Sequence, residues 1–303
     1  MANVFLKEGK KTLQGAVFLS GSGTNAEKLL ESCRANGASR KHWEACVIVT
    51  DRPKTSRARE IASKYGLPLV EAGIYDFYRS RGLEKVSLAT EKARQVREEW
   101  TDLLREKLAP YRIDFGLLAG FVPLCNIVKD FPCLNVHPAD LTYEENGKRA
   151  FAGLHSVGVE LAMLKGGGFL RSSVILVEPF TGAGGGMDAG HVLGVSGKVE
   201  ALYEGHSVEE LQEIFAHRKG PHLHGLHHDL LFTLAEKNQA MLKEKGDWVV
   251  YPAVTEDFAA GCFAEDDDGA LLFREDPCRA FQRIRTVEYS PSGRRVIPLE
   301  PKA

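Results

Sequence analysis

Residues 113–138 read IDFGLLAGFVPLCNIVKDFPCLNVHP and contain two short apolar runs, the pattern of buried strands in a parallel sheet. The second run ends with Asn135 and His137, two positions apart. Residues i and i+2 of a strand share a face, so the amide and the imidazole point the same way. Open α/β sheets bind ligands at the carboxyl ends of their strands, so both side chains are candidates for a site. A polar strand end with a simply hydrogen-bonded histidine is the alternative that so short a motif leaves open.

The chain before this stretch alternates strands and helices. Strands are predicted at residues 15–20, 46–50 and 67–70, and a long amphipathic helix is predicted over residues 83–108. Further helices follow the first two strands, and the second of these is expected to begin near Ser56 and to end at Gly66. This β-α-β-α-β-α-β order predicts an α/β fold with a doubly wound, mostly parallel sheet.

Beyond His137 the pattern is less regular. We expect a surface loop over residues 139–152, helices over 154–164, from Ser207 to 215 and up to about 245, and strands over 172–178 and 191–199. After residue 250, strand-like runs and a hairpin signal at 290–293 predict a small, β-rich C-terminal extension. We therefore divide the chain into an α/β domain, residues 1–250, and an extension packed on it, residues 251–303.

A glycine-rich turn, residues 21–25, joins the first strand to a helix. Glycines let backbone N–H groups approach an anion, and a helix N-terminus favours negative charge. The turn matches neither a dinucleotide G-x-G-x-x-G nor a P-loop, so a single phosphate is the predicted ligand. A tight turn capped by Ser22, Thr24 or Asn25 is the alternative.

A second glycine-rich segment, residues 181–190, carries one acid, Asp188. Dense glycine marks either close approach of the backbone to a ligand or a flexible hairpin. A histidine cluster occurs at positions 217, 222, 224, 227 and 228. His224 and His228 have the spacing of metal ligands on a helix, but no carboxylate or cysteine motif accompanies them, so we expect no metal and leave the cluster unassigned.

The composition is that of an ordinary globular protein, with 44% hydrophobic and 26% charged residues among 303. A formal net charge of −2 gives no electrostatic reason to expect a nucleic-acid partner. No apolar run approaches the roughly 18 residues of a membrane span, and no signal-peptide core is present. The 6 cysteines form no C-x-x-C pair and are expected to be reduced thiols in a cytoplasmic protein.

Three features occur in order: VFLSGSGTN at residues 17–25, LLAGF with LNVHP in the opening stretch, and Asp188 in its glycine-rich loop. Together they resemble the glycinamide ribonucleotide formyltransferase family and the wider group of folate-dependent formyltransferases, over roughly residues 13–245. The resemblance implies a Rossmann-like variant with catalytic Asn135, His137 and Asp188. It implies a substrate phosphate-binding loop of Gly21, Ser22, Gly23, Thr24 and Asn25. The folate-binding residues that it implies are Phe121, Val122, Pro123, Leu124, Gly185, Gly186 and Met187.

The chemistry implied by this resemblance is formyl transfer from the cosubstrate 10-formyltetrahydrofolate to an amine. Attack of the amine on the formyl carbon gives a tetrahedral oxyanion, which Asn135 and a protonated His137 would stabilise from one strand face. Asp188 would hold the imidazolium and relay the proton, directly or through water. The expected partner is a small amine substrate, phosphorylated, bound by a monomer or a homodimer.

Several positions depart from the family pattern and bear on the acceptor. The family's serine after H-P is Ala139 here, and Pro123 stands where the purine enzyme often has arginine. The family's Glu-His pair near the ribose aligns only loosely, with His227 and His228. Phosphoribosylglycinamide, in purine biosynthesis, is the leading acceptor. The alternatives are another amine such as an amino sugar nucleotide, or hydrolysis of the formyl group.

Other classes fit the sequence less well. A tRNA-formylating relative is disfavoured because residues 252–303 carry 7 Lys and Arg against 10 Asp and Glu. A nucleotide-binding dehydrogenase needs a longer glycine turn and an acid after the second strand. A binding module without catalysis would not need the three candidate catalytic side chains, which are present.

Overall fold

The computed structural model describes residues 2–6, 12–35, 42–153, 156–180, 187–220 and 226–299. As far as His137, the elements are β1 (Ala2–Val4), β2 (Leu13–Phe18), α1 (Thr24–Ala35), β3 (Trp43–Thr50), α2 (Ala58–Tyr65), β4 (Leu69–Glu71), α3 (Ile74–Ser80), α4 (Glu91–Leu108), β5 (Phe115–Leu118), η1 (Asn126–Lys129) and β6 (Cys133–His137). The remaining elements are β7 (Glu144–Glu145), β8 (Lys148–Arg149), α5 (Val157–Leu164), β9 (Phe169–Leu170), β10 (Ser173–Leu176), η2 (Met187–Ala189), β11 (Val192–Ser196), β12 (Val199–Glu200), α6 (Val208–Ala216), α7 (Leu230–Leu242), η3 (Lys243–Asp247), α8 (Trp248–Ala259), β13 (Phe263–Asp266), β14 (Leu271–Phe273), β15 (Gln282–Ser290) and β16 (Gly293–Pro298).

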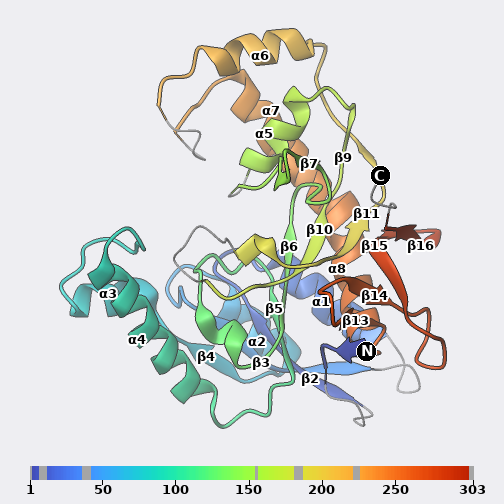
Figure 1. Cartoon of the computed structure of the whole chain (residues 1–303). Helices are drawn as coiled ribbons and strands as arrows, with labels where there is room; N and C mark the ends of the chain where they lie inside the picture. Colours follow the sequence, from blue (N-terminus) through green and yellow to red (C-terminus); the bar gives the residue numbers. More distant parts are fainter. Residues whose placement is uncertain are drawn as a thin grey trace.

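One large sheet dominates the described part of the chain (Figure 1). Its order is β1-β13-β14-β15-β11-β10-β6-β5-β2-β3-β4, and β16 pairs with β15. The five strands from β6 to β4 are all parallel, β10 is antiparallel to both of its neighbours, and β15 is parallel to β11. The prediction of a doubly wound, mostly parallel sheet with extra C-terminal strands is confirmed.

The order of these strands places a topological switch point between β2 and β5. The chain leaves β2 toward β3 on one side and later returns as β5 on the other side. Successive residues of β2 face opposite sides, because side chains alternate along a strand. Val17 packs with α1, α2 and α8, whereas Phe18 packs with α3 and α4. Both faces of the sheet are therefore covered by helices. The place that remains open to a ligand is the edge of the sheet where the connections diverge.

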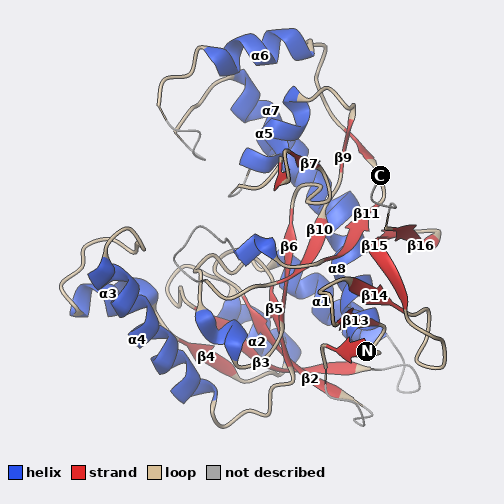
Figure 2. Cartoon of the chain, in the orientation of Figure 1, coloured by secondary structure: helices blue, strands red, loops and turns tan. Residues whose placement is uncertain are grey.

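A smaller lobe stands apart from the sheet (Figure 2). It consists of α5, α6 and α7 with the short pair β9 and β12, and it has its own buried core. Arg218 crosses this lobe and pairs with Glu160 at 2.6 Å and with Asp229 at 2.7 Å. The carboxylate of Asp229 also caps α7, since it accepts from Phe232 N at 2.9 Å.

Two predicted elements are wrong in their extent. The helix predicted over 83–108 begins only at Glu91, because the side chain of Thr90 caps it by accepting from Ala93 N at 3.2 Å. The chain before it is the separate helix α3 and a turn at Gly82, whose φ is +73°. The predicted surface loop after His137 contains the hairpin of β7 and β8.

The chain near residue 250 is helical rather than strand-like. Helix α7 continues through the π-helical turn η3 into α8, which contains Pro252. Proline has no N–H for the helical hydrogen bond, and irregular turns commonly accompany it. The division at residue 250 stays a proposal, since α8 runs across that point.

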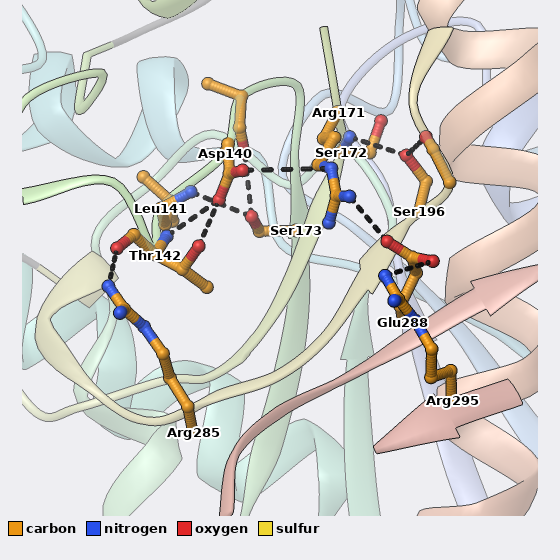
Figure 3. A network of polar contacts seen from close by, with 12 residues as sticks. Asp140, Leu141, Thr142, Arg171, Ser172, Ser173, Ser196, Arg285, Glu288 and Arg295 are labelled. Atoms are coloured by element: carbon orange, nitrogen blue, oxygen red, sulfur yellow. Dashed lines mark hydrogen bonds and ion pairs between the residues drawn. The ribbon is translucent and has the colours of Figure 1, made fainter. Parts of the chain in front are cut away.

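The C-terminal strands complete the sheet rather than form a separate layer. β15 pairs with β11, and β13 pairs with β1. Polar contacts fix β15 to the segment after β6 (Figure 3). Arg285 donates to Thr142 O at 2.5 Å, and Glu288 accepts from Arg171 at 2.5 Å. None of the helices in the described ranges is long and apolar enough to cross a membrane.

Candidate active site

A cavity of about 390 Å³ opens at the carboxyl edge of the sheet, at the switch point. Its wall combines the turns after β2 and β5, the end of β6, and side chains from α7 and η3. The predicted residues on this wall are Gly21, Ser22, Gly23, Thr24, Asn25, Phe121, Val122, Pro123, Leu124, Asn135, His137 and Asp188. Gly185 and Gly186 lie outside the described residues, and so does the side chain of Met187.

Asn135 and His137 lie in β6, which is held in register by β5 and β10. The Asn135 amide lines the cavity and makes no hydrogen bond with any described residue, so its donors and acceptor are available to a ligand. The His137 ring is buried, and its Nε2 lies 3.3 Å from Phe151 O. Because a carbonyl only accepts, this contact requires the proton on Nε2.

The Nδ1 atom of the same ring faces Asp188. Nδ1 lies 3.9 Å from Asp188 Oδ2 in this structure. That distance is longer than a direct hydrogen bond and within reach of an ion pair or of one bridging water. The structure therefore brings together two residues that are 51 positions apart in the sequence. The Asp188 carboxylate is partly exposed, whereas the ring is almost fully enclosed.

The helix α5 comes very close to this histidine. A Cβ atom at Gly158 would lie 2.5 Å from Phe151 O and 3.4 Å from His137 Nε2. Only glycine at position 158 lets Phe151 O reach the ring. This buried contact therefore fixes the orientation of the imidazole and favours the proton on Nε2.

The structure constrains the predicted phosphate loop at Gly23 and at Asn25. Gly23 has φ +66°, and a Cβ there would lie 2.4 Å from Ile61 Cδ1 and 2.7 Å from Leu19 Cδ1. The Asn25 side chain is committed to the protein, since it donates to Asp247 and accepts from Trp248, both at 3.0 Å. The amide oxygen and one of the two amide N–H groups of Asn25 are therefore engaged by the protein, and its backbone remains the expected contact for an anion.

Asp247 is a cavity residue that the sequence reasoning missed. It ends the π-helical turn η3, and its carboxylate accepts from Ser172 Oγ at 2.6 Å and from Asn25 Nδ2 at 3.0 Å. Burial raises the pKa of the Asp247 carboxyl, although both hydrogen bonds act to lower it. π-helical turns often occur at functional sites, and a lone acid before the apolar run WVVYPAV was the available signal.

Asp247 is an acid on the cavity wall. His227 and His228, which align loosely with the family's Glu-His pair, are not among the residues that line the cavity. His227 and His228 precede α7, whereas the cavity is lined by Gln239 and Lys243 from the end of that helix region. Arg52, which follows β3, adds a further cation. The described residues contain no group of three potential metal ligands, and His222 and His224 lie outside the described residues.

No protein-family model matches the chain. In sequence, the chain is 31% identical over 156 residues to the chloroplastic phosphoribosylglycinamide formyltransferase of Arabidopsis thaliana. This match covers 50% of the chain and 45% of the relative, so the chain spans less than half the length of that curated protein.

Solved structures align over much more of the chain. The phosphoribosylglycinamide formyltransferase of Anaplasma phagocytophilum matches with a TM-score of 0.54 and 20% identity over 93% of this chain and 99% of its own. The Coxiella burnetii enzyme matches with a TM-score of 0.54 and 17% identity, covering 86% of this chain and 93% of its own. The chain has the formyltransferase fold. The resemblance inferred from the three motifs is thereby confirmed.

The raised pKa of Asp247 predicts a pH-dependent cost in stability. A folded-state pKa above the unfolded value of about 4 means that the folded protein binds this proton more tightly. Stability is therefore lost as the pH rises from about 4 through the folded-state pKa. Asp247→Asn should raise the Tm at pH 8, by about 2–4 °C for each kcal/mol recovered, and should leave it nearly unchanged at about pH 3.5.

Thermal unfolding at both pH values measures this effect. Asp102→Asn is the matched control, because its side chain is 66% exposed and its pair with Arg105 is a surface contact. An Asp247→Asn variant that gains nothing at pH 8 would show that the buried carboxylate carries no such cost.

Proposed function

We propose that this chain is a folate-dependent formyltransferase that transfers the formyl group of 10-formyltetrahydrofolate to the amine of phosphoribosylglycinamide. The observation that carries the proposal is the meeting of Asn135, His137 and Asp188 on one wall of the cavity at the switch point. A cavity of about 390 Å³ is also within the usual size range of small-molecule sites. The likeness to phosphoribosylglycinamide formyltransferases supports the choice of acceptor.

The proposed mechanism uses each of the three residues once. The acceptor's amine nitrogen attacks the formyl carbon, and the carbonyl oxygen becomes an oxyanion. Asn135 Nδ2 donates to that oxyanion, and its freedom from protein partners makes this possible. Protonated His137 provides a second donor through Nδ1, because Nε2 is held by Phe151 O and because Asp188, 3.9 Å from Nδ1, makes no direct hydrogen bond to it.

Proton transfer completes the reaction. Asp188 accepts the proton that the attacking amine must lose, directly or through a water, and passes that same proton to the leaving folate nitrogen as the C–N bond breaks. The products are the formylated amine and tetrahydrofolate. Asp247, also on the cavity wall, offers a buried acceptor for N–H or O–H groups of the amine substrate.

The binding residues divide by the strand that they follow. We propose that the backbone of Gly21, Ser22, Gly23, Thr24 and Asn25, after β2, contacts the acceptor's phosphate. The folate would contact Phe121, Val122, Pro123 and Leu124, after β5, together with Gly185, Gly186 and Met187. A cytoplasmic protein that acts as a monomer or a homodimer remains our expectation.

The decisive experiment measures formyl loss from 10-formyltetrahydrofolate by purified protein, with and without phosphoribosylglycinamide. Tetrahydrofolate release that depends on this acceptor supports the proposal. Release of formate without any acceptor would instead indicate hydrolysis. Turnover only with an amino sugar nucleotide would keep formyl transfer and replace the acceptor.

Asn135→Ala tests the oxyanion donor. Turnover should fall by about 10²–10³-fold, because one donor to the developing charge is lost. The Tm should change little, since the amide has no hydrogen-bond partner among the described residues. Steady-state kinetics and thermal unfolding measure the two effects, and turnover close to that of the parent protein would refute the mechanism.

Gly21→Val tests the phosphate loop. A Cβ at Gly21 meets nothing within 4 Å, so a side chain fits there without disturbing the core, unlike at Gly23. The bulk at the cavity wall should raise KM for the phosphorylated acceptor by about tenfold, the equivalent of one lost charge-assisted hydrogen bond. An acceptor without the phosphate is the control and should be unaffected; equal effects on both acceptors would place the phosphate elsewhere.

A further inference from the structure

The segment from Tyr143 to Phe151 contacts both members of the His137–Asp188 pair. It folds as the hairpin of β7 and β8, with Asn146 and Gly147 in the turn at φ values of +52° and +72°. The ring of Tyr143 stacks on that of Phe151 with the centroids 4.9 Å apart and 9° between the planes. The hairpin therefore has a fixed base from which Phe151 O reaches His137.

Arg149 is the second point of contact. Its Nη1 donates to Asp188 O, and its Nη2 donates to Gly190 O at 2.6 Å. The guanidinium is partly buried, and burial lowers the pKa of Arg149, while the carboxylates of Asp188 and Glu144 act in the opposite direction. Burying a cation costs free energy, so its use on two backbone carbonyls indicates a demand for a fixed backbone.

Asp188 is followed by residues that are anchored to β10. On its carboxyl side, Gly190 lies against β10, and a Cβ there would lie 1.9 Å from Leu176 O. Leu176 N also donates to His191 O at 2.9 Å, which ties the start of β11 to β10. Arg149 extends this anchorage back by two residues, to the residue whose carboxylate faces His137.

The other end of the segment is anchored to the sheet (Figure 3). Ser173 Oγ donates to Ala139 O at 2.7 Å and accepts from Leu141 N at 2.9 Å. Arg285, from the C-terminal strand β15, donates to Thr142 O. A hairpin fixed at its base in this way is stiff enough to hold the groups that Arg149 and Phe151 contact.

We propose that Arg149 is a positioning residue that acts through Asp188, holding its carboxylate opposite His137 Nδ1 while Phe151 holds Nε2. This inference rests on the proposed function for its kinetic consequences. Arg149 and Phe151 would then set the geometry of the His137–Asp188 pair from outside the cavity, because neither residue lines the cavity.

Arg149→Met removes both donors and keeps the length of the side chain. We expect kcat to fall by about 10–100-fold, with KM for the formyl donor within about threefold, because geometry rather than binding is lost. Arg149→Lys, which can still donate to one carbonyl, should recover part of kcat. Lys148→Gln removes the neighbouring cation, which is exposed and makes no contact with Asp188, and should behave as the parent protein.

A double-mutant cycle separates action through Asp188 from a general loss of structure. In an Asp188→Asn background, Arg149→Met should have little further effect on kcat. Additive losses, or a kcat for Arg149→Met within twofold of the parent value, would overturn the proposal.

An activity-independent measurement distinguishes this proposal from the proposed function. The ring nitrogen chemical shifts of His137, recorded on labelled protein, should change in Arg149→Met and in Asp188→Asn but not in Lys148→Gln. That result would support the positioning role even if phosphoribosylglycinamide were not formylated. Unchanged shifts in Arg149→Met would refute it even if the enzyme were active.

Discussion

The cavity depends on one buried hydroxyl group. Ser20 Oγ donates to Asp51 Oδ1 at 2.5 Å and accepts from Val122 N at 3.0 Å. These three residues follow β2, β3 and β5, so one side chain ties together the turns of three neighbouring parallel strands. Burial raises the pKa of the Asp51 carboxyl, and the serine hydrogen bond partly offsets that effect. The strand connections diverge at this point, and the serine adds a side-chain link to the backbone hydrogen bond from Ser20 N to Gly120 O that also joins two of these turns.

The elements that the sequence predicted well are those with a strong local signal. The apolar runs of β2, β3, β5 and β6 are buried on both faces, which makes them continuous and easy to recognise. The start of α4 was misplaced because Leu83 and Val86 extend the helical spacing of apolar residues, yet they pack against the core from a non-helical segment. Near Pro252, aromatic and β-branched residues mimic a strand, while their burial belongs to a helix.

The candidate site divides in the same way. Asn135 and His137 could be inferred from two residues on one strand face, and Asp188 from a motif order. Asp247 could not, because its partners Asn25 and Ser172 are distant in sequence and meet only across the folded sheet. Arg149 gives no signal at all, since an arginine that binds backbone carbonyls looks like any surface arginine. Long-range hydrogen bonds to the main chain leave no pattern in a single sequence.

The pairing of β1 with β13 has a consequence for how the chain acquires its structure. Ala2 lies opposite Asp266, so β1, the first of the described strands, can pair only with a strand near the other end of the sequence. Closing a contact over almost the whole chain is entropically slow, and it cannot occur on the ribosome until β13 has emerged. Until this contact closes, the outer edge of β13 lacks its partner β1, a short strand whose residues are largely exposed. The far edge of the sheet is thus closed by the first of the described strands.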